Sequence, residues 1–230
     1  MKNNVYAVVP AAGRGTRLGK KIPKAYVPVL GTPLFIHTLR ALKKAFPFKG
    51  IILVVDASDL FRARKELVKH GLGTVTLTLG GSTRAESVHN GLLVVPAGKS
   101  LVAVHDAARP LVSSDVVRRT VQAAQKSTGA ICAIPVSSTV KRFDPKKSVV
   151  LGTEDRSQLL LAQTPQVFRL SILLARYRAL GPKALRATDE AALFDGTKQR
   201  VRVVAGDEKN LKVTTQNDLE SLKKTLLKTT

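Results

Sequence analysis

The sequence predicts an α/β fold with a Rossmann-like, mostly parallel sheet flanked by helices. Short runs of β-branched and aliphatic residues alternate with segments whose apolar residues have helical spacing, which is typical of such a sheet. The length of 230 residues suffices for one generous domain with its own core. The hydrophobic fraction of 44% is ordinary for a globular protein.

Five apolar runs are expected to be the strands of this sheet. They lie at residues 5–10, 51–55, 75–79, 101–104 and 130–135. Each is short, rich in β-branched residues and bounded by polar or turn-forming residues, so each fits a buried strand.

Helices are expected between these strands. Apolar residues at helical spacing mark two of them, at residues 35–46 and 117–124. Helix-start signals agree: Thr83 with Glu86 forms a capping box, Ser113 and Ser114 precede a helix, and Thr215 with Asp218 opens the last one.

The alternation of strands and helices stops after Pro135. Residues 137–155 contain two short extended pieces, around Val140 and Val149, joined by a turn at residues 144–147. We therefore expect a protruding β-arm, inserted at about residues 137–157. Because an isolated hairpin is only marginally stable in water, we expect the arm to pack on a second copy of the chain in a homodimer.

The composition is strongly basic. Thirty-eight Lys and Arg against 16 Asp and Glu give a formal net charge of +22, which favours polyanionic partners. The basic residues are spread through every expected helix and loop, and there is no Trp to act as a stacking platform for a nucleic acid. A solvated basic surface is therefore favoured, and no specific nucleic acid is expected. A basic nucleic-acid-binding protein stays as a distant alternative.

The single cysteine and the apolar segments bear on location. Cys132 stands alone in an apolar run, which fits a reducing compartment. No apolar stretch approaches the roughly 20 residues that a membrane span needs, and the first apolar segment is too short for a secretory core. We expect a cytoplasmic protein without a membrane partner.

The first strand leads into a loop of small residues, which reads Pro-Ala-Ala-Gly-Arg-Gly-Thr-Arg at residues 10–17. Such a loop lets backbone N–H groups approach a phosphate closely. It departs from the dinucleotide fingerprint at Leu18 and from the P-loop at residues 19–21. Arg17 and Lys24, the latter after Pro23, are expected to converge on the phosphates held by the loop.

Further motifs follow the loop in a fixed order. They are Pro23-Lys24, Gly80-Gly81 with Arg84 and Ser87, His-Asp-Ala-Ala-Arg-Pro at 105–110, Pro135 with Thr139 and Lys141, Asp155-Arg156, Thr-Pro-Gln at 164–166, Thr-Asp-Glu at 188–190 and Asn-Leu-Lys-Val-Thr at 210–214. Together they resemble the 2-C-methyl-D-erythritol 4-phosphate cytidylyltransferases of the non-mevalonate isoprenoid pathway. The resemblance covers essentially the whole chain, and it implies a single nucleotidyltransferase domain over residues 1–230.

The resemblance implies transfer of CMP from CTP to 2-C-methyl-D-erythritol 4-phosphate, with release of pyrophosphate and with Mg²⁺ or another divalent cation on the triphosphate. Because both reactants are anions, catalysis of such a step is mostly positioning and electrostatic stabilisation. By the same resemblance, Arg17 and Lys24 stabilise the transition state, and Arg156 and Lys212 place the acceptor phosphate.

The resemblance also implies two sets of binding residues. The nucleotide is expected at Pro10, Ala11, Ala12, Gly13, Gly15, Gly81, Ser82, Ser87, Asp106 and Ala107. The acceptor is expected at Asp106, Arg109, Thr139, Arg156, Thr188 and Lys212. Asp106 is also the candidate residue near the metal. In this family the arm reaches across a two-fold axis, so Thr139 and Arg156 would complete the site of the partner subunit, while Thr188 is expected to cap a helix N-terminus.

Two positions depart from the family pattern. Ser82 stands where an acidic residue is frequent, and Ala25 stands where Gln is common, but main-chain contacts would survive both changes. His105 borders a strand end and is expected to be a packed, structural histidine. The other three histidines show no metal-ligand spacing.

Two other activities share parts of this sequence pattern. A ribitol 5-phosphate cytidylyltransferase would share the first loop and the Asp-Ala-x-Arg-Pro run, but the matches at Thr139, Arg156 and Thr188 favour the methylerythritol acceptor. A nicotinamide-dependent oxidoreductase is disfavoured by Leu18, and Asp56 is the only acidic residue placed to close its second strand.

Overall fold

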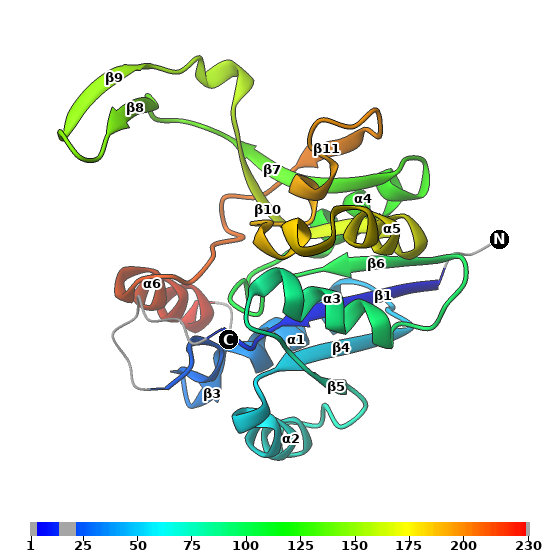
Figure 1. Ribbon diagram of the computed structural model, residues 1–230. Coiled ribbons are helices and arrows are strands. Elements are labelled where there is room, and N and C mark those ends of the chain that lie inside the picture. The colour runs from blue at the N-terminus through cyan, green and yellow to red at the C-terminus, as the bar shows by residue number, and fades with distance from the viewer. Residues whose placement is uncertain (1–3, 14–21, 229–230) are drawn as a thin grey trace.

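The structure is a computed structural model that describes residues 4–13 and 22–228. A sheet of seven strands forms the centre of the molecule. Figure 1 shows this sheet and the helices around it. The strand order is β11-β7-β10-β6-β1-β4-β5, and all strands run parallel except β10. The strands are β1 (Asn4–Pro10), β4 (Gly50–Val55), β5 (Thr76–Leu79), β6 (Ser100–Val104), β7 (Gly129–Pro135), β10 (Leu160–Arg169) and β11 (Val201–Ala205). The mostly parallel sheet predicted from the sequence is therefore confirmed.

Helices cover both faces of the sheet, because the side chains of each strand alternate between the faces. Val5, Ala7 and Val9 of β1 share a buried cluster with the helices α1 (Leu34–Ala45), α2 (Leu60–Lys69) and α4 (Ser114–Gln125). Tyr6 and Val8 share the opposite cluster with α3 (Arg84–Val94) and α5 (Leu170–Leu180). The central strands are thus buried on both sides, which leaves the edges of the sheet open to ligands.

The helix-start signals hold with one difference. Ser113 and Thr215 cap α4 and the last helix, α6 (Gln216–Leu227), and Asp218 completes the capping box of α6. Thr83 caps α3 by accepting a hydrogen bond from the Glu86 N–H group at 3.1 Å. The difference is that the Glu86 carboxylate contacts Ser82, one residue before the cap. It accepts two hydrogen bonds at 2.7 Å, one from the Ser82 N–H group and one from the Ser82 hydroxyl group.

A third, smaller cluster fastens the C-terminal part of the chain to the sheet. The two-stranded pair β2 (Pro28–Val29) and β3 (Thr32–Pro33) packs with α6, through Val29, Leu219 and Leu222 among others. Val213 belongs to this cluster, and its N–H group donates to the Ala108 carbonyl at 2.9 Å. The segment before α6 is therefore held beside the end of β6.

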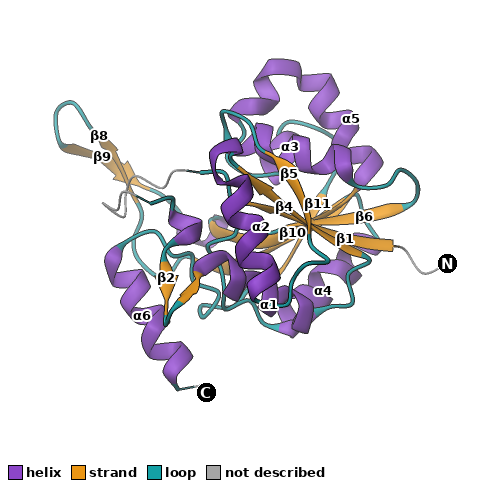
Figure 2. Cartoon of the chain, turned by 90° about the horizontal axis from the view of Figure 1, so that it is seen from below, coloured by secondary structure: helices purple, strands orange, loops and turns teal. Residues whose placement is uncertain are grey.

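The predicted arm is an antiparallel hairpin of β8 (Lys141–Asp144) and β9 (Val149–Thr153), followed by the short 3₁₀ helix η4 (Arg156–Gln158). Figure 2 shows it projecting away from the sheet and its helices. Large apolar side chains on and beside the arm are exposed: Phe143, Val149, Val150, Leu151, Leu160 and Leu161. Exposed apolar area of this kind favours a partner surface.

Over the described parts of the chain, no helix has both the length and the apolar character that crossing a membrane requires.

The close packing of α3 on the sheet requires a residue without a side chain at position 91, where Gly91 stands. A Cβ atom at Gly91 would lie 2.6 Å from a methyl group of Val8 and 2.8 Å from one of Val54. We expect Gly91→Ala to lower the free energy of unfolding by about 1–3 kcal/mol, since overpacking forces the helix off the sheet. Urea unfolding measures this change.

Gly73→Ala is the matched control, because a Cβ atom there has no neighbour within 4 Å among the described atoms. It should change the free energy of unfolding by less than about 1 kcal/mol. Equal stability of the two variants would contradict the packing described for α3.

Candidate active site

A cavity of about 620 Å³ lies at the carboxyl ends of β1, β4 and β6. Open α/β sheets bind their ligands at this edge. The loops after these three strands, the start of α3, Lys24 and Lys212 line it. The lining residues are Pro10, Ala11, Ala12, Gly13, Lys24, Ala25, Asp56, Gly81, Ser82, Thr83, Arg84, Ser87, Asp106, Ala107, Ala108 and Lys212.

The structure brings together all the predicted nucleotide residues that it describes. Residues 10–13, 81–82, 87 and 106–107 all line the cavity. The predicted residues Gly15 and Arg17 lie outside the described residues. Their roles stay predictions from the sequence.

Backbone from two loops forms one wall of the cavity. A Cβ atom at Gly80 would lie 2.6 Å from the Cβ of Ala12 and 2.8 Å from the Ser87 Oγ, so only glycine lets the loops approach this closely. The Ser87 hydroxyl accepts a hydrogen bond from the Gly81 N–H group at 3.1 Å, which holds this wall in place. Small residues of the two loops, Ala11, Ala12, Gly13 and Gly81, line this part of the cavity, and such residues let a ligand approach the main chain.

Asp106 is the charged centre of the site. Its buried carboxylate is 2.8 Å from Lys212 Nζ, 3.2 Å from Arg84 Nε and 3.6 Å from Arg109 Nε. Burial alone would raise the pKa of Asp106, but the attraction of Arg84, Lys212 and Arg109 outweighs it and holds that pKa well below its usual range. Asp106 is therefore ionised, and it fixes the position of the Lys212 ammonium group at the cavity.

Lys24 reaches the same cavity from the opposite end of the chain. It is the first residue of the 3₁₀ helix η2 (Lys24–Tyr26), directly after Pro23, whose ring sets the backbone there at φ −57°. Ala25 and Tyr26 behind it are buried, so the backbone that carries Lys24 is anchored in the core. The structure thus brings two of the four predicted catalytic cations, Lys24 and Lys212, to one cavity.

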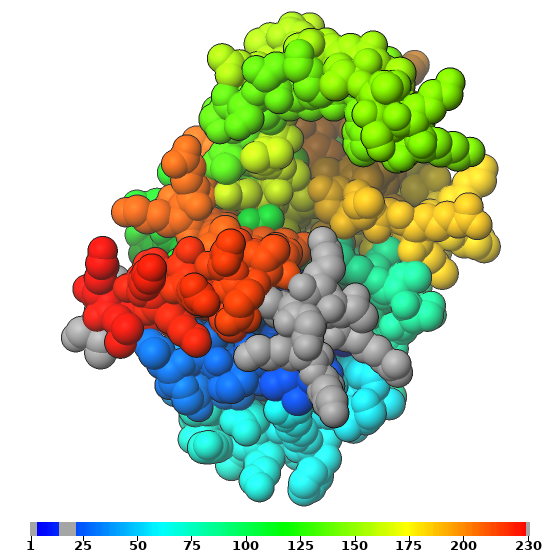
Figure 3. Space-filling view, turned by 90° about the vertical axis from the view of Figure 1, so that its left-hand side faces the viewer, coloured from blue at the N-terminus to red at the C-terminus, as the bar shows by residue number. Residues whose placement is uncertain are grey.

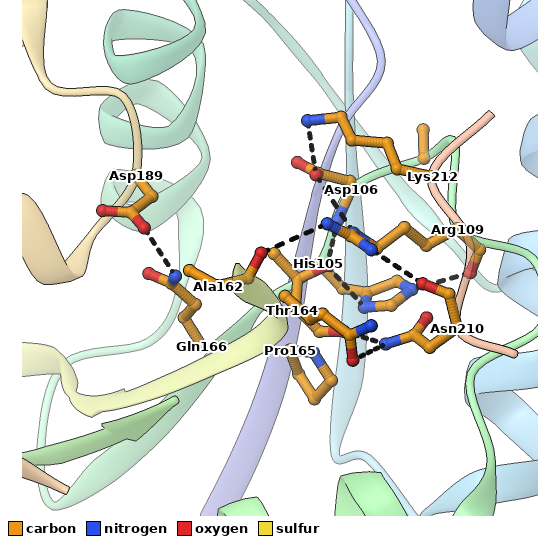
Figure 4. A network of polar contacts seen from close by, with 12 residues as sticks. His105, Asp106, Arg109, Ala162, Thr164, Pro165, Gln166, Asp189, Asn210 and Lys212 are labelled. Atoms are coloured by element: carbon orange, nitrogen blue, oxygen red, sulfur yellow. Dashed lines mark hydrogen bonds and ion pairs between the residues drawn. The ribbon is translucent and has the colours of Figure 1, made fainter. Parts of the chain in front are cut away.

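His105 is the packed, structural histidine that the sequence predicts. It is fully buried, and its Nε2 lies 3.0 Å from the Arg109 carbonyl oxygen, which can only accept a hydrogen bond. Burial lowers the pKa of His105 to about 4, so the ring is neutral with its proton on Nε2. Its Nδ1 then accepts from the Thr164 hydroxyl at 3.0 Å, and that hydroxyl accepts from the Asp106 N–H at 3.1 Å (Figure 4).

Arg109 lies behind the cavity wall rather than in it. Its guanidinium donates to the Asn210 carbonyl at 2.7 Å, and a second nitrogen lies 3.5 Å from the Ala162 carbonyl. The Asn210 side chain donates to the Thr164 carbonyl at 2.8 Å (Figure 4). Arg109 and Asn210 thus tie the segment that carries Lys212 to β10. A direct contact of Arg109 with the acceptor stays a prediction.

Besides Arg109, three further predicted acceptor residues lie outside the cavity lining formed by the described residues. Thr139 and Arg156 are exposed at the base of the arm, where the Arg156 guanidinium donates to the Ser137 carbonyl. The exposed Thr188 precedes the 3₁₀ helix η6 (Ala191–Phe194).

The prediction that Thr188 caps a helix is wrong, because the helix starts later and Glu190 occupies its N-cap position. The Gln166 side chain accepts from the N–H groups of Glu190 and Ala191, at 3.0 and 3.1 Å, and the Asp189 carboxylate accepts from that of Ala192 at 3.0 Å. These side chains satisfy the helix start without Thr188.

Arg84 lines the cavity as well, although the sequence assigned it no role. Arg84 contacts Asp106 through Nε and binds both carboxylate oxygens of the buried Glu190, at 2.9 and 3.2 Å. Arg84 stands in the matching motif after Gly81, which could have marked it. Its partner is 106 positions away, so the pair itself leaves no local signal.

The donor set fits a metal that arrives with the nucleotide. Within the described residues no group of three or more His, Cys, Asp and Glu side chains could hold a metal ion alone. Two carboxylates, Asp56 and Asp106, do line the cavity. A Mg²⁺ ion on substrate phosphates takes only one or two protein oxygens, so these carboxylates suffice.

A cavity at this edge of a mostly parallel sheet, lined by small residues of two loops and by Lys24 and Lys212, is typical of an α/β nucleotidyltransferase. Residues 5–228 match the family described as IspD: 2-C-methyl-D-erythritol 4-phosphate cytidylyltransferase. The chain belongs to this family, as the sequence predicts, and it is therefore a nucleotidyltransferase enzyme.

Individual relatives agree. The chain is 41% identical to the 2-C-methyl-D-erythritol 4-phosphate cytidylyltransferase of Xylella fastidiosa, over 95% of each protein. It is 39% identical to the bifunctional enzyme IspD/IspF of Desulfotalea psychrophila, over 95% of this chain and 55% of that longer protein. The crystal structure of 4-diphosphocytidyl-2C-methyl-D-erythritol synthase from Anaerococcus prevotii superimposes with a TM-score of 0.84 at 29% identity, over 98% of this chain and 96% of that chain.

The neutral, buried His105 makes stability depend on pH. Its pKa falls from 6.5 in the unfolded chain to about 4 in the fold, so the unfolded chain binds the extra proton between these values. Stability is therefore lost as the pH falls from 6.5 towards 4, by about 3 kcal/mol in total. Urea unfolding at pH 7 and pH 4.5 measures the loss.

His105→Gln removes the titrating group, and its stability should fall less than that of the wild type over the same pH range. His70→Gln, which removes a partly buried histidine at the end of α2, is the matched control. If His105→Gln and the wild type lost stability equally, His105 would not be neutral in the fold.

Proposed function

We propose that this chain transfers CMP from CTP to 2-C-methyl-D-erythritol 4-phosphate, giving 4-diphosphocytidyl-2-C-methyl-D-erythritol and pyrophosphate. The main support for this proposal is that Lys24, Lys212 and Asp106 line one cavity together with small residues of two loops. Family membership supports the same reaction, and it does not favour a ribitol 5-phosphate acceptor.

In this reaction an oxygen of the acceptor phosphate attacks the α-phosphorus of CTP. A new P–O bond forms, the bond to the bridging oxygen breaks, and its electron pair leaves with pyrophosphate. Lys24 and, from the sequence, Arg17 would stabilise the negative charge that develops on the phosphate oxygens. Lys24 lines the same cavity as residues 10–13, where the triphosphate is expected.

Lys212 would place the acceptor phosphate for this attack. Its contact with Asp106 at 2.8 Å supports the role, because an ammonium group already held in place needs little reorganisation when the phosphate binds. Asp106 has further lone pairs on its two oxygens, and these would accept hydrogen bonds from the sugar hydroxyls.

The backbone-lined wall would select the base. Gly81, Ser82 and Ser87 lie together at the start of α3, where main-chain groups can contact the edge of cytosine. Divalent metal bound to the triphosphate would neutralise charge on the phosphates, with Asp56 and Asp106 as the candidate carboxylates.

The acceptor half of the site would be completed by a second subunit. Thr139 and Arg156 lie at the base of the arm and outside the cavity lining of their own chain. Figure 3 shows one face of the molecule, with the arm across the top and the C-terminal segment below the arm. The exposed apolar side chains of the arm support its packing on a partner, in a homodimer. A cytoplasmic location, which the lone buried Cys132 favours, belongs to the same proposal.

Pyrophosphate release tests the reaction. With CTP, Mg²⁺ and 2-C-methyl-D-erythritol 4-phosphate the chain should release pyrophosphate, and with ribitol 5-phosphate it should release far less. Lys24→Met should lower kcat by about 10²–10³-fold, since it removes one charge aimed at the transition state. Lys43→Met, at an exposed position of α1, is the matched control. Near-normal turnover of Lys24→Met would remove the role given to that lysine.

Mixed dimers test the shared site. Arg156→Ala and Lys212→Ala chains are each expected to be nearly inactive. After mixing and re-association, half of the dimers are mixed and carry one intact site, so activity should recover to about a quarter of the wild-type value. Pyrophosphate release before and after mixing measures this. Recovery would not occur if Arg156 and Lys212 served the same subunit.

A further inference from the structure

The ion pair of Arg84 and Glu190 stands out among the buried charges. The Glu190 side chain is 1% exposed, and both of its oxygens accept hydrogen bonds from the Arg84 guanidinium, at 2.9 and 3.2 Å. Burial raises the pKa of Glu190, while the attraction of Arg84 opposes this rise. A carboxylate this deeply buried is costly unless it is paired, so Glu190 depends on its two hydrogen bonds with Arg84.

Arg84 joins Glu190 to the reacting part of the cavity. Its Nε donates to Asp106 at 3.2 Å while its two terminal nitrogens bind Glu190, so the fork holds two carboxylates at a fixed distance. Asp106 in turn binds Lys212 at 2.8 Å (Figure 4). The order of contacts is therefore Glu190, Arg84, Asp106 and Lys212.

Glu190 itself is held by a second set of contacts. Its N–H group donates to Gln166 Oε1 at 3.0 Å, and Gln166 donates to Asp189 at 2.9 Å. Gln166 is fully buried in β10, the one antiparallel strand of the sheet. The backbone of Glu190 is thus anchored to the sheet through Gln166, which helps to hold the Glu190 carboxylate in place against Arg84.

We propose that Glu190 is a positioning residue for the acceptor half of the reaction, acting through Arg84 and Asp106 on Lys212. Glu190 is absent from the cavity lining formed by the described residues, so its action is indirect. It holds Arg84 so that Asp106 keeps one oxygen towards Arg84 and the other towards Lys212. This inference rests on the proposed function.

The proposal predicts an effect on one substrate more than on the other. The wall expected to contact the base is held by Ser87, Thr83 and Glu86, whose contacts do not involve Glu190. Loss of the Glu190 charge therefore leaves the contacts that hold this wall in place, while it loosens Asp106 and Lys212. The KM for the acceptor and kcat should therefore change more than the KM for CTP.

Glu190→Gln tests this with almost no change of shape. We expect kcat/KM for 2-C-methyl-D-erythritol 4-phosphate to fall about tenfold, while the KM for CTP changes less than about twofold. Glu190→Asp keeps the charge but shortens the side chain, so it should show the same split if the glutamine variant folds poorly. Glu66→Gln, which removes the carboxylate of a peripheral pair with His70, is the matched control and should match the wild type.

A second measurement separates positioning from a merely structural role. In a Lys212→Met background, Glu190→Gln should lower the remaining kcat/KM by less than about twofold, because the residue through which it acts is gone. Equal weakening of both substrates, or a full tenfold effect in the Lys212→Met background, would overturn the proposal. A wild-type chain that released no pyrophosphate would instead overturn the proposed function.

Discussion

The ionised carboxylate of Asp106 is the interaction on which the site depends. Arg84, Arg109 and Lys212 surround it, and each comes from a different part of the chain: the start of α3, the loop after β6 and the segment before α6. A buried charge is tolerated only when its partners are delivered with good geometry. The fold meets this demand with the mostly parallel sheet, whose carboxyl edge gathers these segments, and with the third apolar cluster, which holds the segment before α6 beside β6.

The charged side chains around Asp106 also explain how a very basic protein can bind an anion at one place. This group holds three positive charges, on Arg84, Arg109 and Lys212, and two negative charges, on Asp106 and Glu190, so one positive charge is in excess. Exposed charges elsewhere are screened over about 8–10 Å at ordinary ionic strength, so most of the net charge of +22 acts only weakly on a bound phosphate. Local, partly buried cations therefore decide where an anionic substrate binds, and the remaining charge contributes mainly to its attraction from solution.

Much of the fold could be predicted because the central strands are continuous apolar runs. The strand β10 could not, since its middle holds Thr164, Pro165 and Gln166, and proline and buried polar residues argue against a central strand. The strand is nevertheless built there, because its pairing with β7 shifts register between Ala162 and Gln166 and because distant groups such as Asn210 satisfy its polar atoms. Such compensation involves residues about 46 positions apart, which no local pattern displays.

The residues of the site likewise divide into those that the sequence could predict and those that it could not. Lys24 and Lys212 could be predicted because each stands inside a recognisable motif. The work of Arg84 and Glu190 could not, because burial and a contact across 106 positions are properties of the folded chain. This difference has a chemical reason: groups that touch a substrate are restricted by the substrate, whereas the groups that hold them need only the right charge in the right place. Two anions must be brought together in the proposed reaction, so the residues that would keep Lys212 towards the acceptor contribute to it alongside the lysine itself.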